Sequence, residues 1–404
     1  MTSTTLFLQP INAIRYSPNF VNARAANVSF LNYSLPVKGA LTTAESNTLV
    51  KGGVAAAIAS ANATFSRDPN FIELFGASTS TGVGVEDSYA GKSNSKTKVI
   101  STFDISRSHS LSFDFLTGID IDAKEIKNPR AEYTKGKATT AFLLLDTSKK
   151  KARVAGYYGV KGKLISSRKV AEIRESPLKR LRGAIADVEL TAAKNLGGND
   201  DVDFLSLGIS GRYQQTFRRD ISEITLVQIT RSATKFAGDT LIGNLGTRVT
   251  YGSIRRDKIT GSRKDDRIYG SLGNDLLRGM GGDDILEGGS GNDRLSGHLG
   301  DDKINGGDGD DIISGGLGRN LLAGGNGADY FVFQRSKVGR IDTILDFEVG
   351  IDKIQRLGRS DRQNFLQNTI DTDAGAQFTS RMGGKILFSG LSVDQLSEAS
   401  SLFA

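Results

Sequence analysis

Aspartates that recur in nine-residue blocks are the residues of this sequence best suited to chemistry. Residues 234–332 divide into eleven consecutive blocks of nine without an insertion, and the sixth residue is Asp in nine of them. The first residue is Gly in ten consecutive blocks, from Gly243 to Gly324. Carboxylates and turn carbonyls are hard oxygen ligands, which suit calcium better than zinc. The aspartates are Asp239, Asp257, Asp266, Asp275, Asp284, Asp293, Asp302, Asp311 and Asp329.

The same spacing indicates the element that must position these carboxylates. The eighth residue is Leu, Ile or Phe in ten of eleven blocks, with Thr250 as the exception. Gly at the first, second and fourth positions permits φ > 0 in the turns. If each block makes half a circuit, aspartates 18 apart in sequence stack at about the 4.8 Å strand spacing. Stacked carboxylates repel unless a cation lies between them, so the pattern predicts a cation-binding solenoid in which each repeat contacts mainly its neighbours.

The repeat G-G-x-G-x-D-x-U-x, as in GGSGNDRLS from residue 288, resembles that of the repeats-in-toxin (RTX) family. The resemblance implies a parallel β-roll that holds about five to seven calcium ions by Asp carboxylates and turn carbonyls. The resemblance implies that pairs of aspartates bind each ion. The pairs on one side of the roll are Asp275/Asp293, Asp293/Asp311 and Asp311/Asp329, and those on the other side are Asp266/Asp284 and Asp284/Asp302. The carbonyl ligands would be Gly270, Gly279, Gly282, Gly288, Gly291, Gly297, Gly300, Gly306, Gly309, Gly324 and Gly327.

Three substitutions interrupt this repeat. Arg255 replaces a turn Gly and makes the Asp257/Asp275 pair a doubtful site. Arg248 and Asn320 replace the sixth-position Asp, so we expect sites that use those turns to be weak or empty.

The segment after the repeats also resembles the closing segment of such rolls. Residues 328–357 carry Asp342, Asp346 and Asp352 between apolar residues, and these acids supply either one more calcium site or a solvated face. The tail from Gly383 predicts a strand, a short helix capped at Ser392 and an apolar end. In the RTX family the uncleaved signal for a type I secretion exporter lies at the C-terminus. The first 20 residues lack the pattern of a cleaved secretory signal, which agrees with that route.

The N-terminal half alternates apolar and polar residues as half-buried strands do. Such short strands with Gly, Ser and Asn connections favour a β-sandwich of jelly-roll type. Part of it, FDISRSHSLSFDFLTGID, vaguely resembles sandwich domains of bacterial surface proteins. Residues 40–63 are compatible with helix or strand. The predicted strands are 26–34, 97–106, 110–118, 139–146, 152–159, 186–193, 211–217 and 223–229.

The charge is divided between the halves: residues 1–235 hold 32 Lys/Arg against 21 Asp/Glu, and residues 236–404 hold 20 against 24. Twelve Lys/Arg lie between Lys149 and Arg182, against Glu172 and Glu175. They form either a solvated surface or a patch for an anionic polymer, such as acidic polysaccharide or lipopolysaccharide. Aromatic interleaving is limited to Tyr157 and Tyr158, which makes nucleic acid an unlikely partner.

Catalytic signatures are scarce. There is no Cys, H-E-x-x-H, G-x-S-x-G or P-loop, and no apolar run of membrane-spanning length. His109 lies between two predicted strands, and we expect a strand surface there; His298 occupies a repeat turn. The acids Asp120/Asp122 and Asp200, Asp201 and Asp203 either bind sugar or calcium or solubilise loops.

The sequence therefore predicts an all-β chain with three parts: a β-sandwich (1–232), a β-roll with its closing segment (233–357), and a cap with the export signal (358–404). We expect a secreted calcium-binding protein with a non-enzymatic adhesion or matrix role. The alternative is an extracellular polysaccharide hydrolase or lyase with the sandwich as catalytic domain. A concave cluster of Arg, Tyr and His would favour the enzyme, and a flat basic face would favour binding. A pore-forming toxin is disfavoured, because no long apolar helical segment precedes the repeats.

Overall fold

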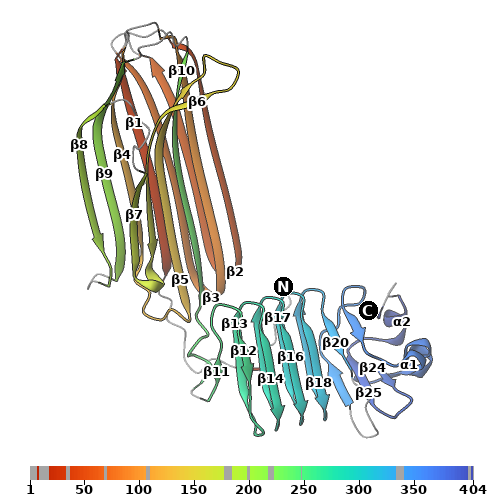
Figure 1. The fold of residues 1–404 in the computed structure, drawn as a ribbon. Coiled ribbons are helices and arrows are strands. Elements are labelled where there is room, and N and C mark those ends of the chain that lie inside the picture. The colour runs from red at the N-terminus through yellow and green to blue at the C-terminus, as the bar shows by residue number, and fades with distance from the viewer. Residues whose placement is uncertain are drawn as a thin grey trace. The chain divides into compact units, whose positions relative to one another are not determined.

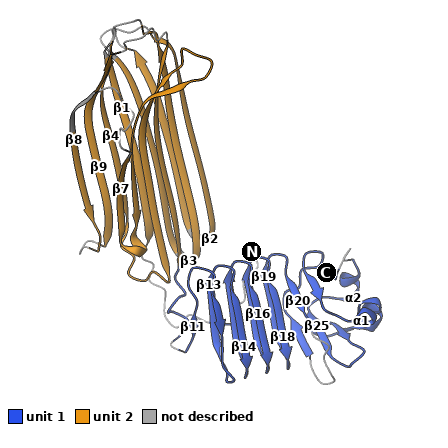
Figure 2. Cartoon of the chain, viewed as in Figure 1, with its two compact units in different colours: residues 1–15, 239–404 blue, residues 16–238 orange. Residues whose placement is uncertain are grey.

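The computed structural model describes residues 7–8, 18–32, 37–67, 71–105, 110–176, 184–197, 201–216, 223–246, 248–333, 341–398 and 402–403. The chain divides into two compact units, one of residues 16–238 and one of residues 1–15 with 239–404 (Figure 2). Within the described residues the first unit is a sandwich of long antiparallel strands, and the second is a ladder of short parallel strands closed by a cap (Figure 1). The predicted all-β class, with a sandwich followed by a parallel β-roll, is confirmed. The division into three functional parts, 1–232, 233–357 and 358–404, remains a prediction.

The strands of the first unit follow one hydrogen-bonded path, β7-β6-β5-β10-β3-β1-β4-β9-β8, with β2 paired to β3. A short 3-10 helix, Ser166–Arg168, separates β6 from β7. The strands are β1 (Asn19–Asn32), β2 (Val37–Arg67), β3 (Phe71–Phe103), β4 (Ser110–Lys124), β5 (Glu132–Asp146), β6 (Arg153–Ile165), β7 (Val170–Ser176), β8 (Ala184–Asn195), β9 (Val202–Thr216) and β10 (Ile224–Asp239).

This path becomes two packed layers because the long strands β2 and β3 run through both. The register of their pairing shifts between Gly52 and Ala55, near the middle of the hairpin. The two halves of β3 then face each other: Ser93 Oγ donates to the carbonyl of Thr81 at 3.2 Å. Asn27 Nδ2 of β1 reaches Thr140 Oγ1 of β5 in the opposite layer at 3.1 Å. One layer therefore holds β5, β6, β7, β10 and the later half of β3, and the other holds β1, β4, β8, β9 and its earlier half.

Alternation sets the interior of the sandwich. Along β4, every second residue from Leu111 to Ala123 is buried. All of these buried residues are apolar except Thr117. Phe113, Phe142 and Tyr213 form an aromatic cluster with ring centroids 5.0–6.0 Å apart. Residues 40–63 are strand throughout, although Ala is the best helix former. Pairing with β3 makes this segment a strand and not a helix, because its alternating small side chains fit the pleated surface that β2 forms with β3.

The second unit is a parallel β-roll of two sheets. One sheet has the order β11-β13-β15-β17-β19-β21-β25-β24-β23, and the other has the order β12-β14-β16-β18-β20-β22. The strands are β11 (Thr250–Tyr251), β12 (Lys258–Thr260), β13 (Arg267–Leu272), β14 (Leu276–Gly281), β15 (Ile285–Ser290), β16 (Arg294–Leu299), β17 (Lys303–Asp308), β18 (Ile312–Leu317), β19 (Leu321–Asn326), β20 (Tyr330–Val332), β21 (Ile341–Ile344), β22 (Lys353–Gln355), β23 (Thr369–Thr372), β24 (Gly375–Thr379) and β25 (Lys385–Ser389).

The eighth residues of the repeats form the core of the roll. Ile268, Leu277, Leu286, Leu295, Ile304, Ile313, Leu322 and Phe331 are each at most 2% exposed. The cap contains α1 (Arg359–Gln363), a 3-10 helix (Leu366–Asn368) and α2 (Val393–Ser397). Ser392 caps α2 in a complete capping box, as the tail predicts. In the closing segment Ile344, Phe347 and Ile354 are buried, whereas Ile351 is 48% exposed.

A short N-terminal stretch contacts the roll through a buried carboxylate. Glu287 Oε1 accepts hydrogen bonds from the backbone N–H groups of Phe7 and Leu8, at 2.5 and 3.0 Å. Its other oxygen accepts from Asn305 Nδ2 at 2.8 Å. Leu8 packs in a cluster with Leu241, Leu245 and Tyr269, so this part of the N-terminus belongs structurally to the roll.

Candidate calcium columns and a basic sheet face

The repeat geometry stacks blocks two apart in register. Strand β15 pairs in parallel with β17, with Ile285 opposite Lys303 and Leu286 opposite Ile304. Strand β16 pairs with β18 in the same way, with Leu295 opposite Ile313. Residues 18 apart therefore lie side by side, as the half-circuit hypothesis requires.

The aspartates form two columns, one at each end of the short strands. In each pair the backbone N–H of the earlier Asp donates to Oδ1 of the Asp 18 residues later, which holds the carboxylate of the later Asp in the turn. One column contains Asp275→Asp293 at 2.6 Å, Asp293→Asp311 at 2.7 Å and Asp311→Asp329 at 2.8 Å. The other contains Asp266→Asp284 at 2.8 Å and Asp284→Asp302 at 2.9 Å. The structure thus brings together the five predicted pairs, and their role as metal ligands remains a proposal.

The second carboxylate oxygen of six aspartates is buried without a hydrogen-bond partner. These oxygens are Oδ2 of Asp275, Asp284, Asp293, Asp302, Asp311 and Asp329. A buried polar atom without a partner costs about 1–3 kcal/mol, and more when it is charged. Six such atoms lie at equivalent positions, and a cation beside them would satisfy every one of them.

Burial shifts the ionisation of the same groups. It raises the pKa of Asp275 to about 8 and that of Asp311 to about 9. The pKa rises to about 7 for Asp302 and Asp329 and to about 6 for Asp284 and Asp293. Burial is the largest cause each time, the backbone hydrogen bond opposes it, and neighbouring aspartates add to the rise for all but Asp293. A cation beside these oxygens would reverse this balance, because opposite charge favours the ionised form.

The glycines surround these oxygens with carbonyls. A Cβ placed on Gly270 would lie 2.7 Å from Asp275 Oδ2 and 2.4 Å from the Gly288 carbonyl. The equivalent Cβ on Gly306 would lie 2.2 Å from Asp311 Oδ2 and 2.6 Å from the Gly324 carbonyl. In the described part of the chain no three acidic or His side chains converge on one point. A bound ion must therefore draw on carbonyls as well as one or two carboxylates, and this oxygen set fits calcium.

The reason for the first glycine of each block differs from our expectation. Second and fourth positions do adopt positive φ, for example +102° at Gly289 and +140° at Gly291. Among the first-position glycines Gly243 has a φ of +87°, but the nine from Gly252 to Gly324 do not have positive φ, so the expectation of φ > 0 is wrong for these nine. At Gly270, Gly288 and Gly306 glycine is required because the Asp Oδ2 of the same block and a carbonyl occupy the space of a Cβ.

The start of each column is closed by serine. Ser253 donates through its N–H and hydroxyl to Asp257 Oδ2 at 2.7 and 2.8 Å. Ser262 holds Asp266 Oδ2 in the same way. Ser at the second position, in a block with Arg or Lys at the fourth, was the available sequence signal for these closed turns.

Asp239 has a structural role. It accepts hydrogen bonds from the N–H of Leu241 at 2.8 Å, from Tyr269 Oη at 2.9 Å and from Ser271 Oγ.

Asn320 places a hydrogen-bond donor where the aspartates of other turns have a partnerless oxygen. Its Oδ1 accepts from the N–H of Asp302 at 3.0 Å, as an aspartate would. Its Nδ2 lies near Gly315, in the place of the partnerless Oδ2 of other turns, and donates to Asp342 Oδ1 at 2.7 Å.

The closing acids bind separate turns. Asp346 accepts from the N–H groups of Gly324 and Gly325 at 2.8 and 3.0 Å. Asp352 accepts from the N–H of Asp329 at 2.9 Å and thereby extends one column. Their participation in calcium binding, like that of Asp342, stays a prediction.

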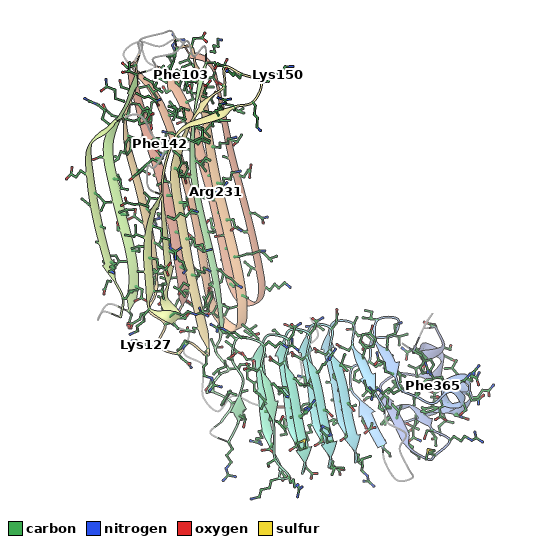
Figure 3. The ribbon with its side chains drawn as sticks, in the orientation of Figure 1. Phe103, Lys127, Phe142, Lys150, Arg231 and Phe365 are labelled. Carbon is green, nitrogen blue, oxygen red and sulfur yellow. The ribbon has the colours of Figure 1, made fainter. Side chains whose placement is uncertain are left out.

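The basic residues of the sandwich gather on one sheet. Lys149, Lys150 and Lys151 are exposed at the β5–β6 turn, where Lys150 extends outward (Figure 3). Lys163 of β6 lies opposite Lys137 of β5, and Lys161 lies opposite Thr139. On the other side of β5, Arg231 and Lys235 of β10 lie opposite Thr139 and Lys135 (Figure 3). We define the basic face as Lys135, Lys137, Lys161, Lys163, Arg231 and Lys235.

The basic face extends beyond the predicted segment. Burial and the nearby cations Lys137, Lys163 and Lys235 lower the pKa of Lys135. Lys163 makes one ion pair, with Glu172 at 3.4 Å. Sequence inspection missed the contributions of β5 and β10, although Lys at 135 and 137 has the period of two that places both on one face. Residues 177–182 of the predicted segment lie outside the described residues.

The other candidate residues do not form a shared site. His298 is exposed within strand β16, where its φ is +77°, and not in a turn as expected; His109 and Asp200 lie outside the described residues. Asp122 accepts from Asn22 Nδ2 at 2.7 Å, and Asp120 accepts from Ser206 Oγ at 2.6 Å. Asp201 pairs with Lys127 at 2.5 Å. Asp203 accepts from the N–H of Gly197 at 2.8 Å and from Ser166 Oγ, and so joins loops of the sandwich.

The geometry defines a parallel β-roll with two columns of aspartates whose Oδ2 atoms lack hydrogen-bond partners. A comparison with known protein families also identifies the repeats. Residues 251–286, 278–313, 287–322 and 305–333 match the RTX calcium-binding nonapeptide repeat in four copies. The chain therefore carries RTX calcium-binding repeats, a repeat family typical of secreted proteins. No curated protein sequence matches the chain. No helix in the described ranges is long and apolar enough to cross a membrane.

Two solved structures are similar over part of the chain. The extracellular lipase LipA from Serratia marcescens is 15% identical with a TM-score of 0.18, over 39% of this chain and 40% of that chain. The AlgE6R3 subunit of the Azotobacter vinelandii mannuronan C5-epimerase is 23% identical with a TM-score of 0.18, over 35% of this chain and 77% of that chain. The chain thus spans about two fifths of the length of the lipase.

Proposed function

We propose that this is a secreted calcium-binding protein whose roll folds on calcium and whose sandwich attaches it to an acidic polymer. The single observation that supports calcium binding best is the row of six buried Oδ2 atoms without partners. Without cations the columns hold carboxylates whose ionisation opposes folding. Calcium binds only the folded roll and shifts the equilibrium by mass action. About five to seven ions, with midpoints near about 10⁻⁴–10⁻³ M, suit an extracellular module.

Calcium titration of the full chain tests this proposal. Circular dichroism should gain β signal sigmoidally with calcium and lose it with chelator, while magnesium at equal concentration changes little. Asp293→Asn should raise the calcium midpoint by about tenfold, because it removes a charged ligand shared by two pairs. Asp257→Asn is the matched control, since Ser253 already holds the Asp257 Oδ2. A roll fully folded in excess chelator would contradict the proposal.

The basic face supports attachment to an acidic polysaccharide or to lipopolysaccharide. It places cations of β5, β6 and β10 on one sheet face, whereas the opposite layer carries Asp114, Asp120 and Asp122 on β4. Repeating carboxylates of a polyuronate match such a face through electrostatic attraction. We therefore favour an adhesion or matrix role over the hydrolase or lyase alternative, because basic residues of three neighbouring strands lie on one sheet face, as expected of a binding surface.

Retention on immobilised polygalacturonate tests the attachment. The wild-type chain should bind and elute as salt screens the charges. Lys137→Glu, Lys161→Glu and Arg231→Glu together should abolish retention without changing the circular dichroism. The matched control reverses three exposed cations of the roll, Lys258, Arg294 and Lys303, for the same change in net charge. Equal retention of both triple variants would show that the basic face is only a solvated surface and not a binding site.

The export route is the remaining part of the proposal. We infer that a type I exporter recognises residues 358–404, on the strength of the RTX repeats that precede them. A passenger fused to these residues should reach the medium when a type I exporter is co-expressed. Unchanged secretion of the full chain after their deletion would disprove this route.

A further inference from the structure

The cap of the roll contains a cavity that lies outside the five aspartate pairs of the two columns. It has a volume of about 320 Å³ and lies among the ends of β22, α1, β24 and β25. Its apolar lining comes from Phe333, Leu357, Phe378 and Ile386, each at most 9% exposed. Met382 adds an apolar side chain that is 46% exposed. This volume falls in the range of about 300–1,000 Å³ that is typical of small-molecule sites.

Four cations line the same cavity. They are Arg356, Arg359, Arg381 and Lys385, of which the three arginines are exposed and the lysine is half-buried. None of them takes part in an ion pair within the described ranges of the chain.

Two acids in the lining are already engaged. Asp361 Oδ1 accepts from the backbone N–H of Arg381 at 2.9 Å. Asp342 Oδ1 accepts from Asn320 Nδ2 at 2.7 Å. The lining therefore carries four cations against two occupied acids, and its excess charge is positive.

The backbone of Arg356 supplies a separate observation. Its φ is +62°, a left-handed conformation that a side chain other than that of Gly, Asn or Asp adopts rarely. Such strain persists only where the surroundings impose it, and it concentrates at ligand clamps. Here it occurs at the residue that joins β22 to the apolar lining residue Leu357.

We propose that this cap cavity binds a small amphipathic anion, namely a carboxylate on an aliphatic body. The apolar lining takes the hydrocarbon, and the arginines bind the carboxylate, for which the planar guanidinium is the preferred partner. A purely inorganic anion would leave the apolar lining without a partner. An uncharged alcohol would leave the cations without one.

Isothermal titration of the calcium-loaded full chain with sodium octanoate tests this site. Octanoate should bind, whereas sodium acetate and 1-octanol should each bind at least about tenfold more weakly, because each lacks one half of the recognition. Arg359→Gln with Arg381→Gln should weaken octanoate by about tenfold or more. Arg294→Gln with Lys303→Gln, remote from the cavity, is the matched control and should bind octanoate as the wild type does.

A second variant guards against misfolding. Met382→Glu keeps the arginines and places an acid at the mouth, so it should weaken octanoate while the calcium-dependent circular dichroism stays unchanged. The proposal is overturned if octanoate fails to bind the wild type, if 1-octanol binds equally well, or if the double arginine variant keeps wild-type affinity. None of these results depends on the polymer-binding role of the sandwich.

Discussion

At the scale of the residue, one atom distinguishes an open calcium turn from a closed one. Asp311 and Asn320 accept the same backbone hydrogen bond through Oδ1. They differ in the second atom, which is a partnerless oxygen in Asp311 and a donating nitrogen in Asn320. An amide N–H therefore replaces the cation at that turn, which gives a physical reason for the expectation that this site is empty.

Asn320→Asp should open this turn to calcium. The new carboxylate would face Asp342, so the calcium-free roll should be less stable than the wild type. With calcium, equilibrium dialysis should count one additional ion per chain. Arg319→Gln, on the neighbouring exposed residue, should leave the count unchanged. An unaltered ion count in Asn320→Asp would show that Oδ2 alone does not define a site.

At the scale of the element, a column behaves as a coupled stack of acids. Burial raises the pKa of these carboxyls from 3.8 to between about 6 and about 9 in the folded, calcium-free roll. An acid whose folded pKa is raised stabilises the fold below its unfolded pKa, and this stabilisation is lost as the pH rises through the folded value. Protons and calcium therefore both neutralise the buried carboxylates of the columns, and they compete for the same oxygen atoms.

Acidification should partly replace calcium. In excess chelator, the β signal of the roll should increase as the pH falls from about 9 to about 5, and it should approach its limit below about 4. The calcium midpoint should move to higher concentration over the same range. Circular dichroism at fixed chelator concentration measures the first effect and calcium titration the second. A roll that loses structure as the pH falls from 9 to 5 would contradict the assignment of the raised pKa values to these columns.

At the scale of the whole molecule, the chain combines two units with different sources of stability. The sandwich has an apolar core that includes Phe113, Phe142 and Tyr213. The roll buries about one large side chain per nine residues and depends on its turns. Glu287, which holds the N–H groups of Phe7 and Leu8, makes the start of the chain part of the second unit.

Calorimetry of the full chain should separate the two units. In chelator we expect one unfolding transition, from the sandwich. Calcium should add a second, whose Tm rises with calcium concentration, since each site stabilises by about 2.7 kcal/mol at one hundred times its Kd. The Tm of the sandwich transition should not change with calcium concentration beyond experimental error. A single transition that moves as a whole would show that the two units unfold together.

The roll, its stacking and its aspartate pairs could be predicted from the amino-acid pattern alone. A nine-residue period is a local signal, and adjacent repeats contact each other, so pattern and contact coincide. The tail helix capped at Ser392 was equally local. The tertiary structure decided what depends on distant residues: the closed turns at Ser253 and Ser262, the donor role of Asn320 and the contact of Glu287 with Phe7 and Leu8. It also decided the basic face, because strands β5, β6 and β10 are separated in sequence and only sheet pairing places Lys137, Lys163 and Arg231 on one surface.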